Sequence, residues 1–192
     1  MTEQKSEQKN TREQLIMAGI SELSERGIAD FSVRRTANRC GVSCAAPYKH
    51  FKDKQSFIAE IITYINRKWD ERQRAAAQTA EKTRQKLIAV CMEFIRFLVE
   101  NPQYRAIIML RHDERDERFN LLRGQLSRQT YQLVSKYCEE VNMPPDVRQR
   151  KTFIVRSLIY GAALMFDNGE LEYTDENLRM VSQSLEREFD LP

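Results

Sequence analysis

The segment that decides the fold is residues 28–54, IADFSVRRTANRCGVSCAAPYKHFKDK. Ser32 offers an N-cap to a short helix, and Gly41 ends that helix. Ser43 predicts the start of a second short helix, which continues to about Lys49. Two short capped helices that meet at a glycine are typical of a helix-turn-helix, because its tight turn favours glycine. The segment therefore predicts a DNA-binding motif.

The positive charge of the chain is concentrated in the same segment. Over the whole sequence, 31 Lys and Arg residues stand against 28 Asp and Glu residues, and that near-balance alone argues against a polycationic nucleic-acid binder. Residues 31–54 nevertheless carry six Lys or Arg and one Asp, whereas residues 1–30 are net acidic and residues 55–192 are balanced. Lys54 also stands at the predicted start of the next helix, where the helix dipole favours a phosphate. The excess charge lies where contact with the DNA backbone requires it.

Outside this segment the composition predicts an all-α protein. The 192 residues include only 6 Gly and 5 Pro, about half the usual joint share, so long helices are favoured over hairpins. These breakers divide the sequence into about nine helices, and the sequence offers no convincing strand or repeat. We expect a flexible arm at residues 1–10, a helix-turn-helix domain at residues 11–56 and a helical regulatory and dimerisation domain at residues 57–192.

Individual helices are predicted from their caps and apolar stripes. A capping box at residues 11–14 starts the first helix, which Gly27 ends. A charged turn is predicted at residues 111–118, and residues 119–141 are predicted to form one long helix. Asp53 opens another long helix, whose predicted buried stripe consists of Phe57, Ile58, Ile61, Ile62, Ile65 and Trp69.

With these features the sequence resembles the TetR/AcrR family of transcriptional regulators. The resemblance covers roughly residues 11–65 and rests on Gly27, Ser32, Val33, Ala37, Gly41, Val42, Ser43, Tyr48, His50, Phe51 and Lys54. Thr36, Cys40 and Pro47 depart from the family pattern, which leaves the operator preference open. The resemblance implies a ligand-released repressor that binds a palindromic DNA operator as a homodimer.

The resemblance also implies DNA contacts residue by residue. Positions that match family contacts to the DNA backbone are Ser32, Tyr48, His50 and Lys54. Positions that can face the DNA at the start of the second helix and around it are Arg34, Ser43, Cys44, Ala45, Ala46 and Lys49. For Tyr48 and His50 we also consider packing in a hinge, and for Arg35 and Arg39 a solvated helix face.

Two further sites are predicted in the C-terminal domain. The resemblance implies a small-molecule effector, whose identity the sequence does not specify. Its pocket is predicted from aromatic and methionine residues at helical spacing, with ordinary core as the alternative for each: Phe94, Phe97, Tyr104, Met109, Tyr131, Tyr137 and Met165. A dimer interface is predicted on the last two helices, with core inside one chain as the alternative: Phe153, Leu158, Gly161, Ala162, Leu178, Val181 and Leu185.

Other classes of function have little support in the sequence. No nucleophile–base–acid set, phosphate-binding glycine loop or metal-ligand cluster occurs, so we expect no enzyme, metal or cofactor. The polar N-terminus and the absence of an apolar run near ~20 residues predict neither a signal peptide nor a membrane span, and thus a cytoplasmic protein. At the turn we expect a buried Cys40 and an exposed Cys44, with a redox switch as the alternative. The alternative function is a helical DNA-binding nucleoid or division factor without small-molecule control.

Overall fold

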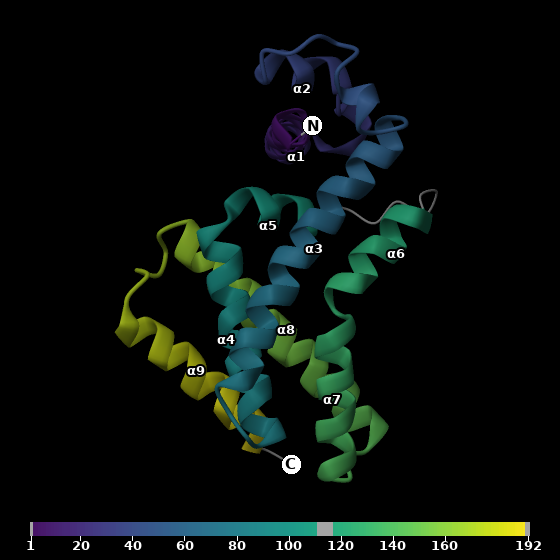
Figure 1. Cartoon of the computed structure of the whole chain (residues 1–192). Helices are drawn as coiled ribbons and strands as arrows, with labels where there is room; N and C mark the ends of the chain where they lie inside the picture. The colour runs from purple at the N-terminus through teal and green to yellow at the C-terminus, as the bar shows by residue number, and fades with distance from the viewer. Residues whose placement is uncertain (1, 111–116, 191–192) are drawn as a thin grey trace. The chain divides into compact units, whose positions relative to one another are not determined.

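The structure is a computed structural model that describes residues 2–110 and 117–190. Within these residues it contains nine α-helices, one short 3-10 helix and no strand (Figure 1), which confirms the predicted all-α class. Residues 111–116 of the predicted charged turn lie outside this description. The chain divides into two compact units, one formed by residues 1–67 and 103–124 and the other by residues 68–102 and 125–192.

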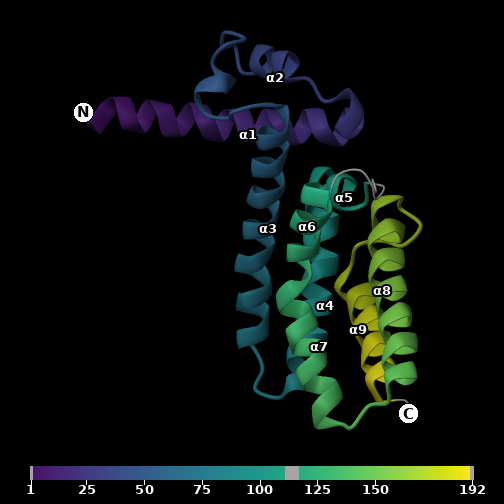
Figure 2. The same cartoon turned by 90° about the vertical axis from the view of Figure 1, so that its right-hand side faces the viewer.

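The first unit is built around α1 (Thr2–Asp30), α2 (Val33–Arg39) and the first part of α3 (Lys54–Gln78). α2 packs along α1 in both views (Figures 1 and 2). The apolar stripe of α1 is fully buried at Leu15, Ile20 and Leu23. The unit also contains most of α5 (Pro102–Ile108) and of α6 (Glu117–Leu126).

Gly19 allows α1 and α3 to approach each other closely. A Cβ atom at this position would lie 2.6 Å from Ile61 Cδ1 and 3.2 Å from the ring of Phe57. Phe57 in turn stacks on Phe51, with ring centroids 4.0 Å apart, and meets Phe31 edge to face at 5.5 Å. These side chains form the core beneath the predicted helix-turn-helix, and the predicted stripe of α3 is buried from Phe57 through Trp69.

The beginning of α1 differs from the prediction. The helix starts at Thr2, so Thr11 lies inside it and does not act as its N-cap. Residues 2–10, TEQKSEQKN, are mostly Glu, Gln and Lys, whose helix propensity is good, and they extend the helix backward. Gly27 interrupts the helix as predicted, with φ at 72° and ψ at −179°.

The second unit contains α4 (Thr83–Glu100), α7 (Arg128–Glu140), α8 (Pro145–Asp167) and α9 (Asp175–Asp190), together with the end of α3. α4 is in contact with α7, α8 and α9, and α8 and α9 lie side by side (Figures 1 and 2). Leu87, Ile95 and Leu98 of α4 are almost completely buried at the centre of this bundle.

The long helix predicted at residues 119–141 is divided in two. α6 ends at Leu126 and α7 begins at Arg128, with Ser127 between them at φ −97° and ψ −5°. Gly124 and Ser127 are weak helix formers, so the apolar periodicity continues across a point where the backbone does not.

The C-terminal end of α9 is fixed by three donors from three other helices. Arg84 donates to Glu186 O at 3.1 Å, Lys151 to Glu188 O at 2.7 Å and the Tyr137 hydroxyl to Phe189 O at 3.1 Å. Carbonyl groups in the last turn of a helix have no partner within the helix, and cations near them also interact favourably with the helix dipole. These bonds attach the end of α9 to the rest of the bundle.

Candidate functional site

The first helix of the predicted motif has the expected caps. Ser32 Oγ accepts a hydrogen bond from Arg35 N at 3.3 Å, and Ser32 O accepts the Thr36 hydroxyl at 2.9 Å. Gly41 follows α2 with φ at 66°, a backbone conformation that favours glycine. Val42 N then donates to Ala37 O at 3.1 Å, which closes the turn. The N-cap at Ser32 and the stop at Gly41 are confirmed.

The second predicted helix, residues 43–49, is not an α-helix. Residues 44 and 45 form a turn, Ala46 is a bend, and only Pro47–Lys49 are helical, in a 3-10 conformation. Pro47 has no N–H and cannot donate to Ser43 O, so one α-helical bond is lost at once. The chain makes i to i+3 bonds instead, with Ala46 N to Ser43 O at 2.9 Å and His50 N to Pro47 O at 2.9 Å.

Arg35 and Arg39 lie on an exposed face of α2, as in the solvated alternative, but both are paired with carboxylates of α1. Arg35 Nε donates to Glu22 Oε1 at 2.7 Å, and Arg39 Nη1 donates to Glu25 Oε1 at 2.9 Å. Glu22 has no exposed surface, although it is a carboxylate. Arg34, which directly precedes Arg35, is exposed and has no hydrogen-bond or ion-pair partner among the described residues. The motif therefore neutralises two of its arginines and leaves Arg34 available.

Most of the predicted DNA-binding residues lie on the surface of the first unit. Ser32, Ala46, His50 and Lys54 are half-buried, whereas Arg34, Ser43, Cys44, Ala45, Tyr48 and Lys49 are exposed. Tyr48 is 57% exposed, so it does not pack in a hinge. Lys52, which is also exposed, adds another positive charge to this surface.

Two of the half-buried residues have defined surroundings. Lys54, the first residue of α3, donates from Nζ to Ala29 O at 3.1 Å, and a lysine ammonium has two further hydrogens for another acceptor. The pKa of His50 is lowered from its ordinary value of 6.5 by burial and by the charges of Arg12 and Lys49. His50 is therefore a neutral imidazole at neutral pH in the protein without DNA.

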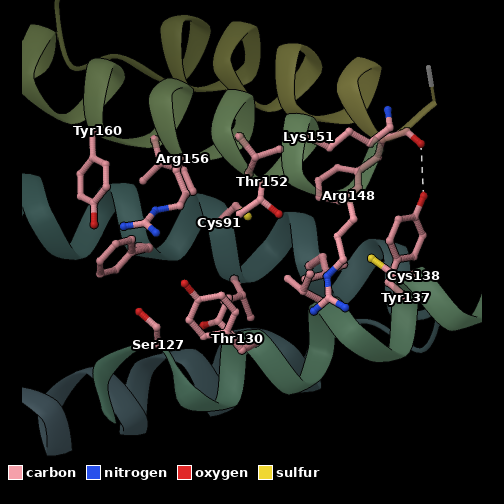
Figure 3. A pocket seen from close by; sticks show the side chains of 18 of the residues that line it. Cys91, Ser127, Thr130, Tyr137, Cys138, Arg148, Lys151, Thr152, Arg156 and Tyr160 are labelled. Atoms are coloured by element: carbon pink, nitrogen blue, oxygen red, sulfur yellow. Dashed lines mark hydrogen bonds between the residues drawn. The ribbon is translucent and has the colours of Figure 1, made fainter. Parts of the chain in front are cut away.

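The second unit contains a cavity of about 130 Å³. This is many times the ~10–15 Å³ that one water molecule needs. Its wall is mostly apolar, with Trp69 from α3 and residues of α4, α7 and α8 such as Val90, Phe94, Val134, Val155 and Ile159. Figure 3 shows polar side chains of the cavity wall, among them Thr130 of α7, Thr152 and Arg156 of α8, and Ser127 just before α7.

The residues predicted to line a pocket have different positions. Phe94, Tyr131 and Tyr137 line the cavity. Phe97 is almost completely buried and is not part of the cavity wall. Tyr104 and Met109 belong to the first unit, and Met165 is 41% exposed on α8 and is not part of the cavity wall.

The residues predicted for a dimer interface also fall into two groups. Phe153 is 71% exposed, Leu158 is half-buried, and a Cβ atom at Gly161 would meet open space. Ala162, Leu178, Val181 and Leu185 are buried within the single chain. Other exposed apolar residues on α8 and α9 are Leu164, Met165 and Met180.

Sequence reasoning missed residues whose partners are distant in the chain. One such residue is Glu22. Its place beside the buried Leu23 of α1, and ahead of an arginine-rich helix, is a signal in the sequence that could have indicated an ion pair with that helix. The cations Arg148 and Arg156 of the cavity wall were also missed, because they sit in a charged helix with no local motif. Cys40 is half-buried and Cys44 exposed.

Within the described residues, no three His, Cys, Asp or Glu side chains converge on a possible metal site, and no helix has the length and apolar character needed to span a bilayer. A capped α2, a glycine turn and an exposed basic segment above a three-helix core define the first unit as a helix-turn-helix DNA-binding domain. Residues 15–61 match the family model described as bacterial regulatory proteins, tetR family. Over this segment the chain is similar to transcriptional regulators of the tetR family.

Similarity to individual proteins extends over most of the chain. A curated relative, the nucleoid occlusion factor SlmA of Pectobacterium carotovorum subsp. carotovorum (strain PC1), is 26% identical over 143 residues, which is 71% of this chain and 72% of that protein. The crystal structure of a TetR family transcription regulator from Marinobacter aquaeolei VT8 is similar in fold, with a TM-score of 0.76, 16% identity and 97% of both chains covered. FadR of Bacillus subtilis, solved in complex with stearoyl-CoA, has a TM-score of 0.69 at 15% identity, covering 92% of this chain and 96% of that one.

Proposed function

We propose that this protein is a transcriptional repressor of the tetR family that binds a palindromic operator as a homodimer and is released by a small molecule. The observation that carries the DNA-binding part is the distribution of charge around α2. Arg35 and Arg39 are paired with Glu22 and Glu25, whereas the exposed Arg34, Lys49 and Lys52 have no ion-pair partner among the described residues. The exposed cations supply contacts to phosphates and bases, and the paired ones hold α2 on α1.

The proposed contacts follow from the chemistry of these side chains. An exposed arginine can donate two parallel hydrogen bonds to a guanine, so Arg34 is the candidate for base recognition. Cys44 and Ala45 are exposed and offer apolar contact to a thymine methyl group. Lys54 and Tyr48 are suited to phosphate oxygens, since Lys54 also lies at the N-terminus of α3.

The proposed dimer uses the exposed apolar surface of α8 and α9. We define this surface as Phe153, Leu158, Gly161, Leu164, Met165 and Met180, which includes three of the predicted interface residues. Large apolar side chains on a helix surface gain free energy when a second copy covers them, and Gly161 permits a close approach of helices. A two-fold dimer then presents two helix-turn-helix domains to the two halves of a palindrome.

The proposed effector site is the cavity of the second unit. α3 begins with Lys54 of the DNA-binding domain and continues to Trp69 in the cavity wall. A ligand that prefers one position of the end of α3 therefore biases the position of its beginning, and it shifts the population away from the DNA-binding form. FadR of Bacillus subtilis, which has a similar fold, was solved in complex with stearoyl-CoA, and this supports the proposal that a small molecule binds the present chain.

Selection of bound DNA from a random pool tests this function. We expect enrichment of a palindrome whose half-sites lie about one helical turn, or a multiple of it, apart. Candidate small molecules are then added to the complex with the selected DNA, and release is measured by a shift assay. Enrichment of no sequence, or of a single half-site only, would contradict a homodimeric repressor.

A second candidate function is favoured by one comparison. The relative named nucleoid occlusion factor SlmA is 26% identical to this chain, so a nucleoid or division factor without small-molecule control is the alternative. Mapping of binding sites across the genome separates the two. Few palindromes near promoters support the repressor, whereas many dispersed sites and no release by small molecules support the alternative.

A further inference from the structure

The cavity of the second unit is positively charged as well as apolar. Its lining, all within the described residues, includes Arg148, Lys151 and Arg156 but no Asp or Glu. An organic cation would find no carboxylate in this wall, and a purely apolar molecule would leave Arg156 without a carboxylate partner. The side chains of the wall favour a ligand that carries both an apolar body and a negative charge.

The three cations differ in how far they are already neutralised. Lys151 is 8% exposed; its Nζ donates to Glu188 O at 2.7 Å and lies 3.5 Å from Glu188 Oε1, so its charge is compensated. Arg148 donates to Ser135 Oγ at 2.9 Å, a neutral partner. Arg156 has no carboxylate partner among the described residues, and its guanidinium lies 5.9 Å from the ring centre of Tyr160. Arg156 is therefore the cation best placed to bind an anionic group.

The neighbours of Arg156 complete a binding site for such a group. Figure 3 shows Arg156 and Tyr160 on α8 near one end of the cavity, with Ser127 across from them, whereas Arg148 and Tyr137 lie near the other end. Guanidinium and hydroxyl donors together suit a carboxylate, and charge-assisted hydrogen bonds are the strong ones. Arg148 and Arg156 are separated by ~12 Å along the helix, a length that a medium alkyl chain spans along the apolar wall.

We infer that this cavity binds an organic anion with an apolar chain, whose carboxylate pairs with Arg156. The inference rests on the proposed role of the cavity as the effector site. It specifies the chemical class of effector, which neither the sequence nor the fold specifies. The apolar chain of the ligand extends from Arg156 along Val155 toward Tyr137. Its carboxylate end lies near Phe94, whose ring is 6.3 Å from that of Tyr160.

The test compares three probes of equal chain length: decanoate, 1-decanol and decyltrimethylammonium. Trp69 is the single tryptophan of the sequence and lines the cavity, so its fluorescence reports binding to the full-length protein. Titration calorimetry gives the affinities independently. We expect decanoate to bind at least about tenfold more tightly than 1-decanol, and decyltrimethylammonium to bind least.

Arg156→Gln identifies the residue that recognises the charge. We expect this variant to lose about 10- to 100-fold in decanoate affinity and to bind 1-decanol as before. Arg74→Gln is the matched control, because Arg74 is exposed, donates to Asp70 O of its own helix and does not line the cavity. Equal affinity for decanoate and 1-decanol, no binding of decanoate, or an equal loss in both arginine variants would overturn the inference.

The DNA complex separates this inference from the proposed function. If decanoate binds through Arg156 but leaves the complex with selected DNA unchanged, the ligand class is supported and release by this ligand is refuted. If selected DNA is bound specifically and decanoate is not, the inference fails while the DNA-binding function remains.

Discussion

Arg35 Nη2 lies 2.6 Å from Glu22 Oε1, and the side chain of Glu22 has no exposed surface, whereas that of Arg35 is 49% exposed. Glu22 is thus a buried carboxylate whose negative charge is compensated by the guanidinium of Arg35. Arg39 is the only further cation recorded near it among the described residues, at 3.6 Å from Glu22 Oε2. The pair fixes the orientation of α2 on α1 and, with it, the direction of the neighbouring Arg34.

Removal of Arg35 is expected to destabilise the DNA-binding domain. Arg35→Ala leaves the buried carboxylate with a weaker partner, and we expect a loss of about 2 kcal/mol in the free energy of unfolding. The double variant with Glu22→Gln removes the uncompensated charge and should recover part of that loss. Urea denaturation followed by circular dichroism measures all three variants. Additive effects of the two substitutions would show that the pair is not coupled.

Arg34 and Lys54 are expected to affect DNA binding in different ways. Arg34→Ala should weaken binding to the selected operator by about 1–3 kcal/mol and change binding to random DNA little, because it removes base recognition. Lys54→Ala should weaken both about equally and reduce the salt slope by about 1, because it removes a phosphate contact. Arg67→Ala, an exposed arginine outside the motif, is the control. Unchanged operator affinity in both variants would refute these assignments.

His50 is expected to make DNA binding depend on pH. In the free protein its pKa lies below the ordinary 6.5 because of burial and the charges of Arg12 and Lys49. A nearby phosphate favours the imidazolium, so the pKa rises in the complex and binding takes up a proton. Operator affinity should therefore increase as the pH falls from the pKa of His50 in the complex to the pKa of His50 in the free protein. Above that range of pH, the affinity should not depend on the protonation of His50.

His50→Gln is expected to abolish this dependence. Anisotropy titrations at constant ionic strength give the affinity at each pH. The other histidine of the sequence, His112, provides the matched control, since His112→Gln should leave the slope intact. A slope that persists without His50 would assign the proton uptake to another group.

Local sequence signals correctly predicted the first helix of the motif and its turn. The prediction of the second helix was wrong because of a single residue, Pro47. The cap at Ser32 and the turn at Gly41 depend on neighbours in sequence, so the pattern reveals them. Pro47 stands where a helix would need an N–H for Ser43 O, and the structure has turns and a 3-10 helix there. Pro47 is visible in the sequence as a departure from the family pattern, but the pattern does not show that it replaces the α-helix by a 3-10 turn.

Positions that depend on contacts between residues far apart in the sequence could not be predicted. Phe94 and Phe97 are three residues apart on one helix, yet Phe94 lines the cavity and Phe97 is buried beside Trp69. Helical spacing places both on a similar face, and only the packing of other helices distinguishes them. The same limit applies to Leu185, which is fully buried, and Phe153, which is exposed, although both were predicted for one interface.

Cys44 is expected to be the cysteine most reactive toward maleimides. It is exposed, whereas Cys91 is buried with its thiol pKa raised to about 12, and burial also raises the pKa of the Cys40 thiol. Alkylation of Cys44 should block operator binding, and bound operator should protect it, because the thiol lies on the proposed DNA surface. Mass spectrometry measures the modification, and Cys44→Ser should make binding resistant to the reagent. Equal reaction rates with and without operator would place Cys44 away from the DNA.

Phe153 is expected to hold the proposed dimer together. It is 71% exposed in the single chain, so a charge at this position leaves the fold of the protomer intact but places an unpaired carboxylate in the apolar surface of α8. Phe153→Asp should be a monomer by light scattering at a concentration where the wild type is a dimer. Its circular dichroism spectrum should match that of the wild type, and its melting temperature should be lower because the stabilisation by the second copy is lost. Its operator affinity should fall at least about tenfold, because each monomer reaches only one half-site.

Leu121→Asp introduces the same charge at an apolar residue that is 70% exposed on α6, and it should remain dimeric. A dimer that persists in Phe153→Asp would show that the two copies associate through another surface, whereas loss of the dimer in both variants would point to a nonspecific effect of the added charge.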